Sequence, residues 1–250
     1  MTEGKLHNGA AYRSFEEIDS TNEEAKRLAA QGERGPLWLV ARMQTGGRGR
    51  RGRAWISPPG NLYCTLLIAP QCTPAEGAQL SFVAALAAAH MVSCIAGRSP
   101  VKLKWPNDLL IDGKKMGGIL LESASAPGAA MLDWLAVGIG VNVTSHPEGT
   151  ETPATSLKEE GIVTPLGMLD CLQFLAFGWD DWFTQWKTQG FEPIRMDWLY
   201  RAHGLNQPIT ARLGQESVSG IFRDLDETGA LALELADGSR RKISAGEVFF

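Results

Sequence analysis

The sequence has few cysteines and no cysteine pattern. Only four occur in 250 residues, Cys64, Cys72, Cys94 and Cys171. No two of them have the Cys-x-x-Cys spacing that is typical of zinc sites and thiol redox motifs. Cys64 and Cys94 lie in apolar runs. The pattern favours free thiols, mostly in the core, over disulfides, and predicts a reducing compartment such as the cytoplasm.

Segments that would direct the chain to a membrane are also missing. Residues 1–14 contain no apolar stretch that could serve as a signal peptide. The longest uncharged apolar run, 80–96, spans 17 residues and is rich in alanine. A membrane-spanning helix needs about 20 strongly apolar residues. We therefore expect a buried core helix here and no membrane association.

A large excess of charge of one sign is absent as well. The 24 Lys and Arg residues stand against 28 Asp and Glu residues, for a net charge of −4, and 44% of residues are hydrophobic. This composition excludes a mainly disordered chain and a protein that coats a polyanion with its whole surface. Four arginines nevertheless fall within six positions, interleaved with glycine: Arg48, Gly49, Arg50, Arg51, Gly52 and Arg53.

Hydrophobic patterning predicts alternating strands and helices up to Gly204. A capping-box signal at 19–24 predicts the start of the first helix, which Gly32 would end. Further helices are predicted at 80–96, 165–190 and 194–202, and strands at 12–18, 37–41, 62–68, 101–105, 109–111, 118–122 and 132–143. Short alternating segments with turns at 226–229 and 237–238 follow. We expect two domains, 1–204 and a small β-barrel at 205–250.

The arginine-glycine segment, residues 44–53, has three interpretations. It could be a solvated basic turn, a contact to a nucleic-acid backbone, or a structured cradle for an anion, in which glycines allow close backbone approach and arginines clamp a carboxylate or phosphate. The segment follows a predicted strand and begins with the polar Gln44. Trp55 lies two residues after its last arginine and could stack on a base. This context favours the anion cradle.

A second candidate cluster follows the strand at 101–105. Lys104, Asn107 and Asp108 offer one cation and hard oxygen ligands, which suit a magnesium nucleotide. Lys115 begins an apolar, glycine-bearing strand, where partial shielding from water would strengthen its charge interactions. Taken alone, Lys115 is more typical of a surface hairpin with a Lys-Lys turn.

Two glycines inside the strand at 132–143 form a third candidate. Gly138 and Gly140 indicate close approach of a ligand or another part of the chain, or a bulge. Asn142 follows and offers a donor and an acceptor suited to the edge of a base.

Six segments together resemble those of a known family. In chain order they are Ser20-Thr21-Asn22, QTGGRGRRGRAW (44–55), KWPND (104–108), KKMGGIL (114–120), GIGVNV (138–143) and ATSL (154–157). Their order and spacing resemble biotin protein ligase. Only 11 residues precede Tyr12, so the resemblance is to the form without an N-terminal DNA-binding domain. It implies an α+β fold: a mixed sheet flanked by helices, as in class II synthetases, then an SH3-like β-barrel.

The resemblance implies a biotin site in which Ser20, Thr21 and Gln44 hydrogen-bond the ureido ring. A buried urea needs partners for its donors and acceptors. Lys115 resembles the catalytic lysine that bridges the biotin carboxylate and the α-phosphate, with Arg48 and Arg50 beside it. The implied biotin-binding set is Ser20, Thr21, Gln44, Gly47, Arg48, Arg50, Lys115 and Gly118.

A second implied set binds ATP and the adenylate. Trp55 resembles the residue that stacks on adenine, Asn142 the amide that reads its edge, and Asp108 a ligand of Mg²⁺. The whole set is Arg53, Trp55, Lys104, Asn107, Asp108 and Asn142.

The implied activity uses ATP and Mg²⁺ to convert biotin to biotinyl-5′-AMP. Biotin then passes to a lysine of a biotin carboxyl carrier domain, in acetyl-CoA carboxylase or a related carboxylase. The family includes homodimers, so a homodimer is one expected state. Lipoate–protein ligase, of the same fold, is the enzymatic alternative. A nucleic-acid-binding protein built on the arginine-glycine segment is the alternative from another class.

Overall fold

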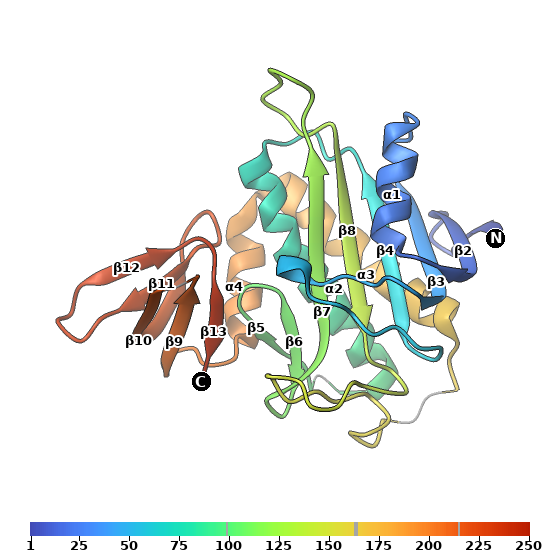
Figure 1. Ribbon diagram of the computed structural model, residues 1–250. Coiled ribbons are helices and arrows are strands. Elements are labelled where there is room, and N and C mark those ends of the chain that lie inside the picture. The colour runs from blue at the N-terminus through green and yellow to red at the C-terminus, as the bar shows by residue number, and fades with distance from the viewer. Residues whose placement is uncertain (99, 163–164, 215) are drawn as a thin grey trace.

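An eight-stranded mixed sheet forms the centre of the protein (Figure 1). The computed structural model describes residues 1–98, 100–162, 165–214 and 216–250. The strand order is β1-β2-β3-β4-β8-β7-β6-β5, in which β2 and β3 run parallel and the other neighbours antiparallel. The strands are β1 (Thr2–Lys5), β2 (Ala11–Ile18), β3 (Leu37–Gln44), β4 (Leu62–Ile68), β5 (Lys102–Lys104), β6 (Asp108–Ile111), β7 (Lys114–Ala124) and β8 (Trp134–Val141).

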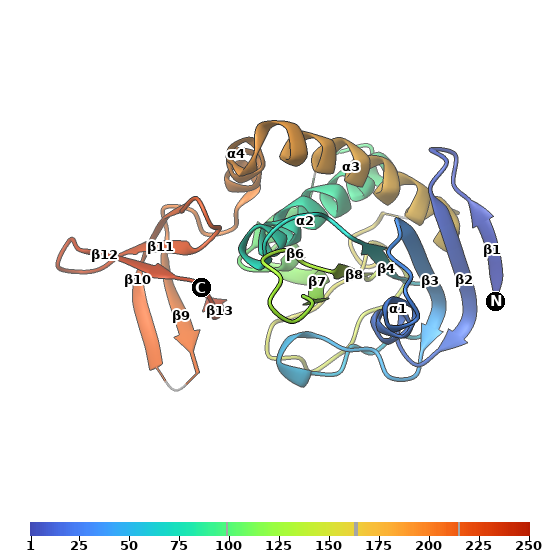
Figure 2. The ribbon, with the colours of Figure 1, turned by 90° about the horizontal axis from the view of Figure 1, so that it is seen from above.

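Helices cover both faces of this sheet (Figure 2). α1 (Thr21–Ala30) packs on one face, against β3, β4 and β8. The other face carries α2 (Pro74–Ala96) and α3 (Met168–Gln189). α4 (Phe191–Arg201) packs against these two helices. Trp38 of β3 meets Trp179 of α3 edge-on, with ring centroids 6.4 Å apart. The buried apolar side chains between the sheet and α2–α4 form the main core.

The apolar run at 80–96 lies in α2, as predicted, but the helix begins six residues earlier, at Pro74. Thr73 and Glu76 form a reciprocal capping box there, and Gly97 ends the helix with a left-handed φ of 63°. Among the described residues, α2 is the one helix long and apolar enough to cross a membrane. Most of it is buried against the sheet and α3, so core packing accounts for its composition.

One sequence prediction is wrong, and one strand was missed. The capping box predicted for α1 does not form, because Ser20 makes no side-chain capping bond and the Thr21 N–H donates to Gln44 instead. Strand β1 was not predicted, because four residues of mixed polarity give no recognisable pattern. Cys94 is exposed, whereas Cys64, Cys72 and Cys171 are buried; all four are free, as predicted.

A second sheet follows Gly204. Its five antiparallel strands have the order β12-β11-β10-β9-β13. The strands are β9 (Pro208–Leu213), β10 (Glu216–Leu225), β11 (Leu231–Glu234), β12 (Arg240–Ile243) and β13 (Glu247–Phe249). The Trp105 Nε1–H donates to the carbonyl of Gly229, 3.0 Å away, and joins the two parts. The observed fold is the expected α+β arrangement, while the exact boundary at 204/205 stays a prediction.

Candidate active site

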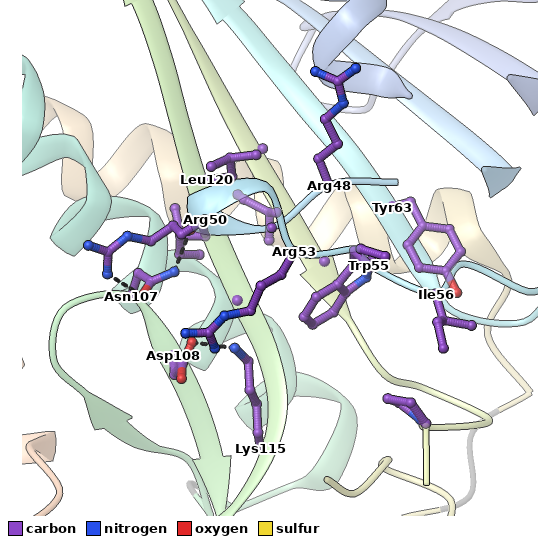
Figure 3. A pocket seen from close by; sticks show the side chains of 18 of the residues that line it. Arg48, Arg50, Arg53, Trp55, Ile56, Tyr63, Asn107, Asp108, Lys115 and Leu120 are labelled. Carbon is purple, nitrogen blue, oxygen red and sulfur yellow. Dashed lines mark hydrogen bonds and ion pairs between the residues drawn. The ribbon is translucent and has the colours of Figure 1, made fainter. Parts of the chain in front are cut away.

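One cavity collects nearly all of the predicted site residues (Figure 3). Its volume of about 320 Å³ lies in the usual range for small-molecule sites. The start of α1, the arginine-glycine segment, β6–β8 and the segment 147–154 line it, and Gly246 and Glu247 of the C-terminal part complete it. Every predicted site residue lines the cavity except Gly47 and Lys104.

A buried polar cluster forms the wall next to α1. Gln44 Oε1 accepts hydrogen bonds from the Thr21 N–H at 2.9 Å and from Thr21 Oγ1 at 3.2 Å. Gln44 Nε2 donates to Ser57 Oγ at 2.9 Å, which fixes the orientation of the amide. Ser20 is buried beside them. Gln44 joins the end of β3 to the start of α1, so residues far apart in the sequence form one recognition surface.

Gly47 supports this wall from outside the cavity lining. A Cβ at residue 47 would lie 2.4 Å from the carbonyl oxygen of Trp55 and 2.6 Å from Ser57 Oγ. The Trp55 N–H in turn donates to the Gly47 carbonyl at 2.9 Å. Gly47 therefore allows the two ends of the arginine-glycine segment to pack against each other.

Asn22 lines the same wall and was not assigned a role from the sequence. Thr65 Oγ1 lies 2.6 Å from Asn22 Oδ1, and Asn22 Nδ2 donates to Glu122 Oε2 at 2.8 Å. A Cβ on Gly138 would lie 2.2 Å from Asn22 Oδ1. The glycine inside β8 thus makes room for a side chain of α1, and its pairing with β4 and β7 continues without a bulge.

The arginines of the segment contact different parts of the protein. Arg50 Nη1 donates to Asn107 Oδ1 at 3.0 Å, and burial lowers the pKa of the Arg50 guanidinium. Arg53 Nη1 donates to Glu247 Oε1 at 2.7 Å, and this pairing holds the pKa of Glu247 below its usual range. Arg48 points away from both, and its Nη1 lies 2.8 Å from Glu23 Oε1 of α1 (Figure 3).

Lys115 and Asp108 form an ion pair inside the cavity. Lys115 Nζ lies 2.6 Å from Asp108 Oδ1 and 5.6 Å from the centre of the Trp55 ring. Both side chains are largely shielded, at 26% and 13% exposed. The register of β6 and β7 shifts next to Lys115, between Leu109 and Leu110. A cation in this place can meet an anionic ligand in surroundings that screen it less than water does.

Trp55 lies across the glycines of the sheet. A Cβ on Gly140 would lie 2.8 Å from the indole ring, and one on Gly118 would lie 3.6 Å from it. The Trp55 Nε1–H is buried and has no hydrogen-bond partner among the described residues. The absence of side chains at the two glycines allows the indole to lie against the sheet, and its Nε1–H is a donor in the cavity wall without a protein acceptor among the described residues.

Asn142 and Lys104 differ in their relation to the cavity. The buried Asn142 lines it, and its Nδ2 donates to the Thr155 carbonyl at 3.0 Å. Lys104 is 4% exposed, with its Nζ 5.6 Å from the centre of the Phe249 ring. Burial lowers the pKa of Lys104. The structure therefore places Lys104 beneath the C-terminal sheet, next to the cavity but outside its lining.

No group of three or more His, Cys, Asp or Glu side chains able to hold a metal occurs in the described ranges. Asp108 and Asn107 both line the cavity, and their oxygens are bound to Lys115 and Arg50. Mg²⁺ commonly binds through one or two carboxylates plus substrate phosphates. The donor set fits a metal that arrives with a nucleotide.

Comparison with known proteins gives the same assignment along the chain. Residues 14–142 match the model of the Biotin/lipoate A/B protein ligase family, and residues 204–250 match the Biotin protein ligase C terminal domain. A biotin–[acetyl-CoA-carboxylase] ligase of Paracoccus denitrificans is 45% identical over 241 residues, covering 93% of this chain and 97% of the relative. The bifunctional ligase/repressor BirA of Escherichia coli is 30% identical, covering 92% of this chain and 71% of BirA.

Solved structures of biotin protein ligases have the same fold. The biotin protein ligase of Aquifex aeolicus in complex with biotin and ATP is 29% identical and superimposes with a TM-score of 0.80, covering 95% of this chain and 97% of that one. The Leishmania major enzyme in complex with biotinyl-5-AMP is 25% identical with a TM-score of 0.66, covering 94% and 98%. The expected mixed sheet with flanking helices and SH3-like C-terminal domain is thereby confirmed. The chain belongs to the biotin/lipoate A/B protein ligase family and is a ligase that carries the C-terminal domain of biotin protein ligases.

Proposed function

We propose that this protein activates biotin with ATP to biotinyl-5′-AMP and transfers biotin to a lysine of a biotin carboxyl carrier domain. One observation carries the proposal: a single cavity joins the Gln44–Thr21 polar wall, the Lys115 and Arg50 cations and the Asn142 amide. These are the three elements that a urea, an acyl phosphate and a base require. The names of the relatives supply the substrate, and the C-terminal domain match favours biotin over lipoate.

Recognition of biotin begins at the wall formed by α1 and β3. Ser20, Thr21 and Gln44 offer hydroxyl and amide groups to the ureido ring. The ring is polar, so its burial is favourable only if these partners replace water. Gly118 lets the ligand approach β7, because no side chain projects there.

Activation joins the biotin carboxylate to the α-phosphorus of ATP. A carboxylate oxygen attacks phosphorus in line, the bond to the bridging oxygen breaks, and pyrophosphate leaves with its electron pair. Negative charge accumulates on the phosphoryl oxygens, where Lys115 Nζ and the Arg50 guanidinium stabilise it. Arg53 is a further predicted contact and has to exchange its present partner Glu247 for the ligand; Arg48, also predicted as a contact, is paired with Glu23 of α1.

Four residues would bind the nucleotide: Trp55, Asn107, Asp108 and Asn142. Trp55 offers a flat surface for adenine and Asn142 an amide oxygen for its amino edge. Asp108 would hold Mg²⁺ together with phosphate oxygens, and the metal would neutralise charge on the departing pyrophosphate. Lys104, buried behind Asp108, adds positive potential without contact.

Transfer completes the reaction. The neutral ε-amine of the carrier lysine attacks the carbonyl carbon of the mixed anhydride, AMP leaves, and an amide forms. Water must be excluded between the two steps, because it would hydrolyse the adenylate. We propose that the arginine-glycine segment covers the adenylate and is more mobile before ligand binds. The proposal includes a cytoplasmic location, a carboxylase as partner and domains at 1–204 and 205–250; a homodimer stays a prediction.

The decisive experiment compares biotin and lipoate as substrates. Purified protein with ATP and Mg²⁺ should release pyrophosphate with biotin and label a biotin carboxyl carrier domain. A preference for lipoate would replace the proposal with the alternative from the same family. RNA binding that is sensitive to salt and survives saturation with biotinyl-5′-AMP would instead support the nucleic-acid alternative.

A further inference from the structure

Arg48 stands apart from the other cations of the cavity. Its guanidinium points away from Arg50, Arg53 and Lys115 and toward α1 (Figure 3). The partner is Glu23, in the first turn of that helix, at 2.8 Å. Arg48 is thus the arginine of the segment that binds α1, the helix whose start forms the polar wall of the cavity.

Glu23 is itself held in place. Lys26 Nζ lies 2.9 Å from Glu23 Oε1, and it also pairs with Glu122 on β7. Glu122 accepts a hydrogen bond from the cavity residue Asn22 at 2.8 Å. A continuous series of polar contacts therefore runs from the cavity wall, through β7 and α1, to the arginine-glycine segment.

The arginines of the segment attach it to three other parts of the protein. Arg48 binds α1, Arg50 binds Asn107 between β5 and β6, and Arg53 and Arg51 bind Glu247 of β13. Within the segment, the Gly49 N–H donates to the Arg53 carbonyl and the Trp55 N–H to the Gly47 carbonyl. These bonds close a small hairpin, bridged at Arg48 and Ala54. The attachment to α1 is the one at the base of this hairpin.

We infer that Glu23 is a positioning residue: through Arg48 it fastens the base of the arginine-glycine hairpin to α1, and so slows loss of the adenylate from the cavity. The slower loss of the adenylate rests on the proposed function, whereas the attachment of the hairpin to α1 does not. In this role Arg48 acts on the ligand through the position of the hairpin rather than by direct contact. Removing either partner should therefore have the same effect.

Hydrogen–deuterium exchange of residues 47–55 in the ligand-free protein tests the attachment. A partly exposed ion pair supports an increase in exchange rate of about two- to fivefold for Glu23→Gln. Glu24→Gln is the matched control, because Glu24 is on the same helix turn, is similarly exposed (20% against 24%) and pairs with Arg27 instead. Salt should speed exchange more in the wild type and in the control than in Glu23→Gln, which lacks the Glu23–Arg48 ion pair and keeps only the ion pairs with Glu247.

A double-mutant comparison tests the mechanism. Glu23→Gln and Arg48→Gln should speed exchange equally, and the double variant should add nothing further. Unchanged exchange in Glu23→Gln would overturn the attachment, whether or not the protein uses biotin.

The link to the reaction has its own readout. Preformed biotinyl-5′-AMP should dissociate faster from Glu23→Gln than from the wild type, by the same factor as the increase in hydrogen exchange rate. The rate of pyrophosphate release at saturating substrate should not change. Loss of adenylate at the wild-type rate would overturn the positioning role. A far larger defect in Arg48→Gln than in Glu23→Gln would show that Arg48 contacts the ligand directly and would overturn it too.

Discussion

At the scale of single residues, two side chains of the cavity occupy space that is free only because glycine lies opposite them. Gly138 makes room for Asn22 and Gly140 for Trp55, each at a distance where a Cβ would collide. The glycines in an otherwise apolar strand predicted a close approach, and the structure confirms it. The identity of the approaching groups could not be predicted, because Asn22 and Trp55 are more than 80 residues away in the sequence.

Replacing Gly140 by alanine should move the Trp55 ring. The added Cβ would lie 2.8 Å from the indole, which packs against the sheet at this point, so the ring would have to move. We expect kcat/KM for pyrophosphate release to fall about ten- to hundredfold, as for other small displacements of binding groups. Steady-state kinetics with ATP varied measures it.

Gly167→Ala is the control for this change. A Cβ there meets only Asp170 Oδ2, at 3.5 Å, at the start of α3 and outside the cavity. Equal activity of the two variants would mean that the position of Trp55 is unimportant for ATP.

Lys115→Ala should lower adenylate formation about 10²–10³-fold, the range for removing one preorganised electrostatic group. Lys115 is partly exposed and lies at a strand start, so the fold should persist. Pyrophosphate release measures the loss, and circular dichroism checks the fold. The neighbouring Lys114→Ala removes a lysine that pairs with Glu160 and should be nearly silent. A Lys115→Ala enzyme with wild-type turnover would remove Lys115 from the mechanism.

At the scale of elements, the sequence predicted the parts whose signal is local. β4 matches the predicted range 62–68, and α3 and α4 lie within a few residues of their predicted bounds. The start of α1 lies at Thr21, within the predicted 19–24, but the predicted capping box does not form, and Gln44 of β3 accepts a hydrogen bond from the first N–H of the helix. The start of α2 was misplaced because its first turn is polar and carries no apolar run.

The capping box of α2 gives a prediction at this scale. Thr73→Ala removes the acceptor of the Glu76 N–H and the partner of the Glu76 side chain. The free energy of unfolding should fall by about 1 kcal/mol, the usual value for a lost N-cap. Urea denaturation measures this value. Thr188→Ala, in the last turn of α3, deletes a hydroxyl that only bonds back to its own helix and should change stability far less.

At the scale of the whole molecule, the C-terminal sheet is part of the site. Glu247 of β13 lines the cavity and binds Arg53, and Phe249 lies between Lys104 and Arg212. Nearly all of the site residues predicted from motifs line the cavity, because they come in short contiguous runs. The motifs could not predict Glu247, which is 194 residues from Arg53 and belongs to none of them.

Acid should weaken the C-terminal sheet through Asp226. Burial raises the pKa of this carboxyl, but hydrogen bonds from Lys242, Thr228 and Ala230 outweigh that effect and lower the pKa from 3.8 to about 2. A folded-state pKa below the unfolded value gives stability at neutral pH that is lost as pH falls through the folded pKa. The wild type should therefore lose stability from about pH 4 toward pH 2.

Asp226→Asn isolates this contribution. The variant should be less stable than the wild type at pH 7, and its melting temperature should depend less on pH in the acid range. Differential scanning calorimetry across that range compares the two. Curves that run parallel at every pH would assign the acid sensitivity to other carboxyls.

Two cations of the cavity, Lys115 and Arg53, already have a carboxylate partner supplied by the protein, Asp108 and Glu247, and Arg50 is bound to the amide of Asn107. An incoming anion therefore meets neutralised sites and has to displace carboxylates. A bare inorganic phosphate offers too few other contacts to offset that exchange, whereas a ligand that also fills the polar wall and the Trp55 surface does offset it. The internal ion pairs thus act as a filter that lets the site ignore the abundant small anions around it.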